Sequence, residues 1–167
     1  MPDIYHEILI IAAADKVYDA ITTKDGLAAW WTPRADAKAE TDSIATFPFG
    51  EGYFKEMKIT GLIPSEQVKW TCIKGAEEWM GTHLSFKLED GDQQTLSNSH
   101  PEIEGQIQQQ ASGQTATLLI FHHDDWKDYT PMFAECNYTW AQFLRSLKLF
   151  CETGKGRPWP YQHRIDQ

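Results

Sequence analysis

Residues 131–153 read PMFAECNYTWAQFLRSLKLFCET, and this stretch predicts one long helix from near Pro131 to about Thr153. Bulky side chains recur at steps of three and four residues, as in a helix that packs one face on another layer. The stripe consists of Phe133, Asn137, Trp140, Leu144, Leu147 and Cys151. Gly154 follows directly and is a typical helix stop. A helix of this length needs a second layer to cover its apolar face.

That second layer is predicted from strand-like segments earlier in the chain, which are rich in β-branched and aromatic residues or alternate in polarity. The predicted strands are Ile4 to Ala12, Ser43 to Phe49, Gly52 to Ile63, Gln67 to Ile73, Thr82 to Glu89 and Thr117 to His123. Pro64 and Ser65 predict one turn, and the run Asp90-Gly91-Asp92 is typical of a tight hairpin.

Two short helices are expected after the first strand. Asp15 can cap the first, which carries Val17 and Ile21 on one face, and the second covers Thr23 to Trp31 and ends before Pro33. Helices and strands are segregated along the chain, which indicates an α+β fold. The simplest arrangement is a curved antiparallel sheet with the long helix lying across it. Because a bent sheet and a straight helix cannot meet along their whole length, a pocket is expected between them.

The length of 167 residues fits one domain, which we expect to span residues 1–154. Within it, residues 93–115 are rich in Gln, Ser, Asn and Gly and predict a long exposed loop insertion. Residues 155–167 hold two Pro and one Trp and predict an extended C-terminal tail.

Composition excludes several classes of function. The formal net charge is −9, and the one basic cluster, Lys155, Arg157 and Arg164, is too small to bind nucleic acid or an anionic membrane. The three cysteines form neither an even disulfide set nor a close metal pair. The N-terminus has acidic residues and no long apolar run, so we expect neither a signal peptide nor a membrane helix, and a cytoplasmic location.

Several motifs occur in an order that is known from one superfamily. They are Ile8 to Ile10, Ala12 to Thr22, Gly26 to Trp31, Gly52 to Phe54, Ile63 to Thr71, Leu119 to Trp126, and the closing helix with Trp140, Leu144, Leu147, Lys148 and the run from Glu152 to Gly154. In these motifs the chain resembles the START-like, helix-grip (SRPBCC) superfamily. Within it, the chain is similar to the group related to the activator of the heat-shock-protein-90 ATPase and to polyketide cyclase-like proteins.

The resemblance implies a helix-grip fold, in which a curved antiparallel sheet wraps around a long C-terminal helix and two short helices follow the first strand. Members of the superfamily include lipid carriers, polyketide cyclases, hormone receptors and co-chaperone domains, so the fold does not fix the function. The chain departs from the group at His122 to Trp126, where a single His is usual, and in the long stretch at residues 93–115.

Aromatic and apolar residues from all these segments are candidates for the wall of a ligand pocket. With two polar residues, the candidate ligand-binding set is Trp30, Trp31, Phe54, Met57, Trp70, Phe86, Phe121, His123, Phe133, Asn137, Trp140 and Leu144. Each ring considered alone is more simply interpreted as core filling, because protein interiors pack densely. The resemblance favours a pocket for the set as a whole, since apolar walls with few polar groups suit small molecules.

The run His122-His123-Asp124-Asp125 is the sharpest polar cluster. Its residue types suit a metal, but neighbouring strand residues point to opposite faces, so a solvated strand end is favoured over a metal site. His123 shares a face with Leu119 and Phe121, which makes it the most plausible acid–base group. Further polar candidates are Glu56, His83 and Glu135, of which His83 is expected on the outer face. We predict no metal and no cofactor.

Three functions remain open. The first is binding of a small hydrophobic or amphipathic ligand between the sheet and the C-terminal helix. The second is an enzyme of cyclase, hydratase or hydrolase type in the same pocket, although no catalytic motif is recognisable. The third is regulation of a chaperone ATPase, which is disfavoured because such activators carry an additional N-terminal domain, whereas this chain starts at the first strand. A homodimer is compatible with each.

Overall fold

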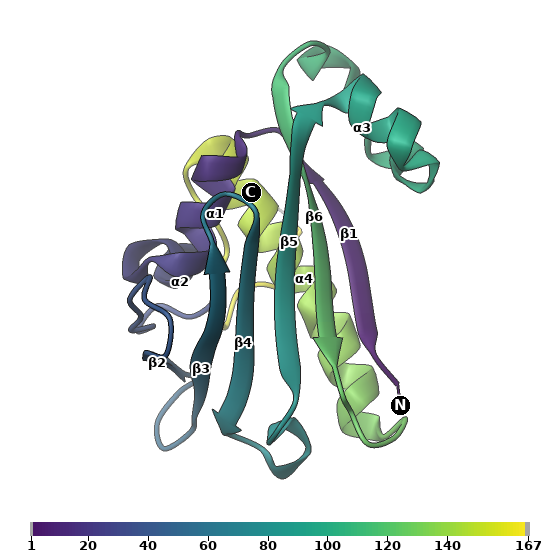
Figure 1. Cartoon of the computed structure of the whole chain (residues 1–167). Coiled ribbons are helices and arrows are strands. Elements are labelled where there is room, and N and C mark those ends of the chain that lie inside the picture. Colours follow the sequence, from purple (N-terminus) through teal and green to yellow (C-terminus); the bar gives the residue numbers. More distant parts are fainter. Residues whose placement is uncertain (1, 166–167) are drawn as a thin grey trace.

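The computed structural model describes residues 2–165 and has the predicted α+β helix-grip architecture (Figure 1). Six antiparallel strands form one sheet in the order β1-β6-β5-β4-β3-β2. Their bounds are β1 Ile4–Ile10, β2 Ile44–Pro48, β3 Phe54–Ile63, β4 Gln67–Lys74, β5 His83–Asp92 and β6 Thr115–Asp124. The helices α1 (Ala14–Thr22), α2 (Lys24–Trp30) and α4 (Pro131–Thr153) pack on one face of this sheet around a common core.

The long helix α4 has the predicted bounds. The Thr130 hydroxyl accepts a hydrogen bond from the Phe133 backbone N–H, which caps the N-terminus. Gly154 ends the helix in the left-handed conformation, with φ at 87°. The buried face consists of Phe133, Trp140, Phe143, Leu144, Ser146, Leu147 and Cys151. Asn137 is exposed, so the predicted stripe was wrong at this position.

The two short helices are present, but the cap of the first was predicted wrongly. Ala13 is the N-cap of α1, and Asp15 lies inside its first turn. Thr23 caps α2 by accepting from the Gly26 backbone N–H. A Cβ atom at Gly26 would lie 2.7 Å from the Cα of Ala20. The close approach of α2 to α1 therefore requires glycine at this position.

The stretch predicted as a loop is folded. Asp90-Gly91-Asp92 does not form a hairpin, because β5 continues to Asp92 along β6 and Asp92 then caps α3 (Gln93–Ser99). Two 3-10 helices follow, at Pro101–Gln106 and Gln109–Ala111. Leu96 and Ile103 anchor this segment, packing with residues of β1 and β6 that face away from α4. Together with Ile107 and two hydrogen bonds between Gln106 and the β1 backbone, they hold an otherwise polar segment on the outer face of the sheet.

The C-terminal tail folds back onto α2 and α4. It was predicted as extended, but it contains turns over residues 159–163. The Trp159 backbone N–H donates to the Trp31 carbonyl at 2.8 Å, and the Arg157 N–H donates to the Ser146 hydroxyl at 2.7 Å. A Cβ at Gly156 would lie 2.6 Å from the Ala29 carbonyl oxygen. These contacts place Trp159 against the sheet–helix layer. Within residues 2–165, no helix combines the length and apolar character that crossing a membrane requires.

Candidate ligand-binding cavity

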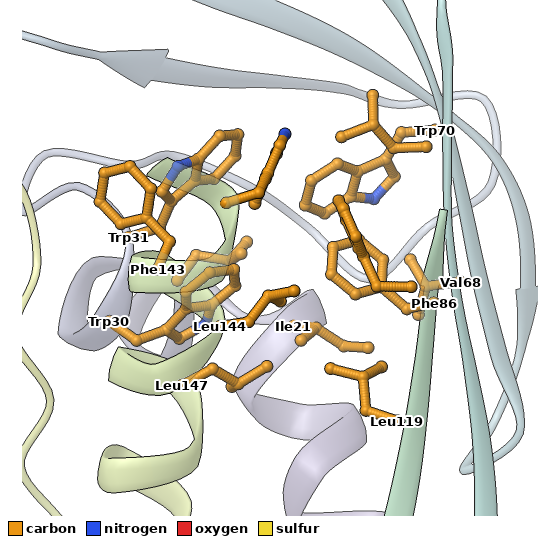
Figure 2. Packing of buried hydrophobic residues seen from close by; sticks show 14 of the residues in the cluster. Ile21, Trp30, Trp31, Val68, Trp70, Phe86, Leu119, Phe143, Leu144 and Leu147 are labelled. Atoms are coloured by element: carbon orange, nitrogen blue, oxygen red, sulfur yellow. The ribbon is translucent and has the colours of Figure 1, made fainter. Parts of the chain in front are cut away.

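The middle of the sheet–helix interface is filled by aromatic rings (Figure 2). Trp31 lies between the layers, with its ring centroid 5.8 Å from that of Trp70 and 5.2 Å from that of Trp140. Most of the candidate ligand-binding residues are buried here as core, namely Trp30, Trp31, Met57, Trp70, Phe86, Phe121, Trp140 and Leu144. Phe133 is buried farther along α4 against Trp126. Where these rings meet, no room remains for a ligand.

A cavity of about 400 Å³ opens beside this filled region. Its walls come from the β2–β3 connection and the start of β3, from the 3-10 helix Glu77–Trp79, from α4 and from the tail. The lining residues are Trp31, Phe49, Tyr53, Lys55, Trp79, Glu135, Cys136, Thr139, Trp140, Phe143, Trp159 and Gln162. We call this space the Lys55 cavity. Of the candidate ligand-binding residues, Trp31 and Trp140 line it, and of the further polar candidates, Glu135 does.

Lys55 is the residue that sequence reasoning missed. Its side chain enters the cavity wall from β3 and is only 8% exposed. Its Nζ lies 4.2 Å from the ring centroid of Phe49, 4.7 Å from that of Tyr53 and 4.6 Å from that of Trp79. Among residues 2–165, no carboxylate forms an ion pair with it. Three ring faces thus hold a buried ammonium group that has no anion beside it.

Burial lowers the pKa of Lys55 to about 8, because desolvation disfavours the charged form. Two thiols lie close enough to interact with it electrostatically, those of Cys72 and Cys136. Burial raises the pKa of both thiols, so they stay protonated near neutral pH and do not neutralise the ammonium. Cys136 also accepts a hydrogen bond from the Trp79 indole N–H at 3.3 Å.

Alternation along β3 could have revealed Lys55. Lys55, Met57 and Ile59 are buried on the face that meets α4. Phe54 was predicted to share the pocket with Met57, but an odd spacing puts the two on opposite faces of a strand. Phe54 lies with Glu56 on the outer side, where both line a separate open hollow. A lysine at an inward-facing position of a strand is therefore the sequence feature that could have identified the site.

His123 points inward from β6, as alternation predicted, and is fully buried. Its Nδ1 accepts from the Trp140 indole N–H at 3.1 Å, and its Nε2 lies 2.8 Å from the Thr82 hydroxyl oxygen. The Thr82 hydroxyl in turn donates to the Trp79 carbonyl at 2.6 Å. Since an indole N–H can only donate, the partners assign the proton to Nε2 of a neutral imidazole.

This network removes His123 from the candidate catalytic groups. Burial, and secondarily the charge of Lys55, lower the pKa of His123 to about 3. Both ring nitrogens already have partners, and the residue is not part of the cavity wall. His123 therefore orients the Trp140 ring and does not offer a free lone pair to a ligand.

The other polar candidates lie elsewhere on the surface. His83 is exposed on the outer face, as expected, and its Nδ1 lies 2.6 Å from Asp125. His122 pairs with Asp124 at 3.6 Å. These pairs share no centre with His123. One group of metal-ligand type occurs among the described residues, Glu7, His100 and Glu102, where His100 is already bonded to Glu89 at 2.7 Å and to Glu102 at 3.3 Å.

Comparison with known proteins now identifies the family. The family described as "Activator of Hsp90 ATPase homolog 1-like protein" matches residues 12–152. The chain belongs to this family. It is 36% identical to the Aha1 dimer from Colwellia psychrerythraea, with a TM-score of 0.71, over 93% of this chain and 100% of that one. No curated protein matches the chain.

More distant structures share the fold of this family member. Protein SSP2350 from Staphylococcus saprophyticus is 15% identical, with a TM-score of 0.66 over 94% of this chain and 97% of that one. DynU16, from the dynemicin biosynthetic locus, is 18% identical, with a TM-score of 0.64 over 92% of this chain and 48% of that one. At these identities the likeness concerns the fold alone. The expected homodimer and the cytoplasmic location stay predictions for this chain.

Proposed function

We propose that this protein binds a small apolar or amphipathic molecule in the Lys55 cavity. The observation that carries the proposal is a space of about 400 Å³ walled mainly by aromatic rings, in an interface that is otherwise densely filled. Cavities of roughly 300–1,000 Å³ with apolar walls and a few polar groups are typical of small-molecule sites. The predicted position between sheet and helix is kept, but the set of contacting residues is revised.

The cavity wall supports binding more than catalysis. Its ionisable side chains are those of Tyr53, Lys55, Glu135 and Cys136, and burial holds the thiol protonated. His123, the most plausible acid–base candidate from the sequence, is outside the wall and bonded at both nitrogens. What the wall offers instead is contact area, from Trp31, Phe143 and the other rings.

A neutral fluorescent probe tests this proposal. N-phenyl-1-naphthylamine, whose emission rises in apolar surroundings, should bind the native wild-type protein with one-site saturation. Thr139 lines the cavity from α4, so Thr139→Phe should fill the space and lower the affinity for the probe at least about 10-fold, the scale of 1.4 kcal/mol. Ala141→Phe is the matched control, because Ala141 is an exposed residue of the same helix.

Two results would contradict the proposal. One is fluorescence that appears only under partly unfolding conditions, which reports a loosened core instead of a native cavity. The other is equal probe affinity for Thr139→Phe and Ala141→Phe, with both variants shown by circular dichroism to be folded. Native mass spectrometry of the purified protein adds a direct search for a bound molecule.

A further inference from the structure

We propose that the Lys55 cavity selects a small organic anion, an apolar carboxylate whose charged end pairs with the Lys55 ammonium group. This inference rests on the proposed function and names the class of ligand. The apolar body of the molecule would contact the rings of the wall, and its carboxylate would reach the inner side at β3.

The charge of the Lys55 ammonium group has no partner of opposite sign among the described residues. Lys55 is more than nine-tenths buried and lines the cavity, and no ion pair within residues 2–165 involves it. A buried charge is costly unless it is paired or hydrogen-bonded. The rings of Phe49, Tyr53 and Trp79 compensate part of this cost through their π faces. They do not accept the hydrogen bonds that three N–H donors can make. A carboxylate oxygen bound in the cavity would accept such a hydrogen bond and pair with the charge.

The electrostatic surroundings of Lys55 come from three other elements of the fold. The groups that interact with it are the thiol of Cys72 on β4, the thiol of Cys136 on α4 and the imidazole of His123 on β6. Burial keeps both thiols protonated and the imidazole neutral. The acidic residue of the wall, Glu135, is exposed. The inner end of the cavity is therefore positive, although the whole chain carries a formal charge of −9.

The number of cationic side chains in the wall indicates the kind of anion. Lys55 is the one cationic side chain in the wall. A doubly charged phosphate usually takes several donors or an arginine fork, whereas one lysine matches a monoanion. The rest of the wall is mainly aromatic and suits an apolar body. The combination fits an amphipathic acid of modest size.

The test compares two molecules of nearly the same shape, one anionic and one neutral. 2-Naphthoate and 2-naphthamide displace N-phenyl-1-naphthylamine from the wild-type protein at pH 7, and their dissociation constants are measured from the loss of fluorescence. We expect naphthoate to bind about 10- to 100-fold more tightly, the range for a hydrogen bond to a charged group in a buried site. This comparison needs no variant.

Three variants assign the preference to one side chain. Lys55→Met keeps the length of the side chain without its charge, and it should bind both compounds with the affinity that the wild type has for the amide. Lys55→Arg keeps the charge and should retain a preference for naphthoate. Lys74→Met is the matched control, because Lys74 also lies over an aromatic ring, that of Phe54, but is exposed. It should keep the full wild-type preference.

The outcomes separate this inference from the proposed function. If both naphthalene compounds bind the wild type equally, the anion preference is wrong while the apolar cavity stands. If Lys55→Met keeps the preference, another group supplies the charge and the inference is again overturned. If the neutral probe itself does not bind the native protein, the proposed function fails first. If Lys55→Met does not fold, the wild-type pair still tests the anion preference, and a loss of that preference in Lys55→Arg would contradict its assignment to Lys55.

Discussion

Two buried basic side chains contact the ring of Trp79, and their surroundings differ in one respect. The Trp79 ring centroid is 4.5 Å from that of His123 and 4.6 Å from the Nζ of Lys55. Both ring nitrogens of His123 have a partner, and aromatic rings pack around the imidazole. On the Lys55 side the charge has no anion, and a cavity of about 400 Å³ opens. A complete set of partners indicates a structural group, whereas an incomplete set facing empty space indicates a binding site.

The largest expected effect tests the filled side. Trp140→Ala should lower the free energy of unfolding by about 3–5 kcal/mol, the usual cost of removing a large buried aromatic side chain. Trp140 is 2% exposed and contacts Trp31 and Phe121, and its removal also leaves His123 Nδ1 without a donor. Urea unfolding measures the loss. Tyr138→Ala, at an exposed position of the same helix, should cost less than about 1 kcal/mol. Equal losses would show that the Trp140 ring is not part of a densely packed core.

The next effect tests the unpaired charge through pH. The folded protein loses the Lys55 proton near pH 8, whereas the unfolded chain keeps it to about pH 10.5. Between these values the unfolded state binds more protons, so Lys55 makes the free energy of unfolding rise with pH. Relative to Lys55→Met, wild type should gain at most about 3 kcal/mol from pH 8 to pH 10.5, at 1.36 kcal/mol per pKa unit.

The comparison between the two proteins reports Lys55 together with its charge effect on the thiols of Cys72 and Cys136. Burial raises the pKa of Cys72, Cys136 and Tyr53, which makes stability fall with pH in the same range, but all three are present in both proteins. Urea unfolding at several pH values gives the two curves. Lys74→Met should run parallel to wild type. Parallel curves for wild type and Lys55→Met would mean that Lys55 is well solvated.

The elements that follow a local pattern could be predicted from sequence. The helix Pro131–Thr153 and the strands came from periodicity, which depends on neighbours within a few residues. The failures come from distant partners. The run Asp90-Gly91-Asp92 has good turn residues, yet pairing with residues 115–117 of β6 keeps it in β5. Leu96 and Ile103 were too sparse to predict a folded segment, because their partners are supplied by β1 and β6.

The candidate site was only partly predictable for the same reason. Burial of the aromatic set followed from the pattern of each element, but whether a buried ring is core or cavity wall depends on where sheet and helix diverge. Trp31 and Trp140 are at that boundary, while Trp70 and Phe86 are within the filled part. Trp159 reaches the wall through the docked tail. His123 was chosen as a candidate because of its residue type. Lys55 was not chosen, although the alternation along β3 places Lys55 on the inward face.

The smallest expected effect is on ligand binding at the filled side. His123→Gln should change the affinity for 2-naphthoate less than 10-fold, because His123 does not line the cavity and Gln offers one acceptor and one donor group in place of the two ring nitrogens. Lys55→Met should lose about 10- to 100-fold in the same assay. In NMR spectra, the His123 ring signals should not titrate between pH 5 and pH 9, since its pKa is lowered to about 3. A His123 ring that titrates near pH 6.5, or a His123→Gln loss as large as that of Lys55→Met, would move the charged binding group from β3 to β6 and reverse the assignment of the two sides.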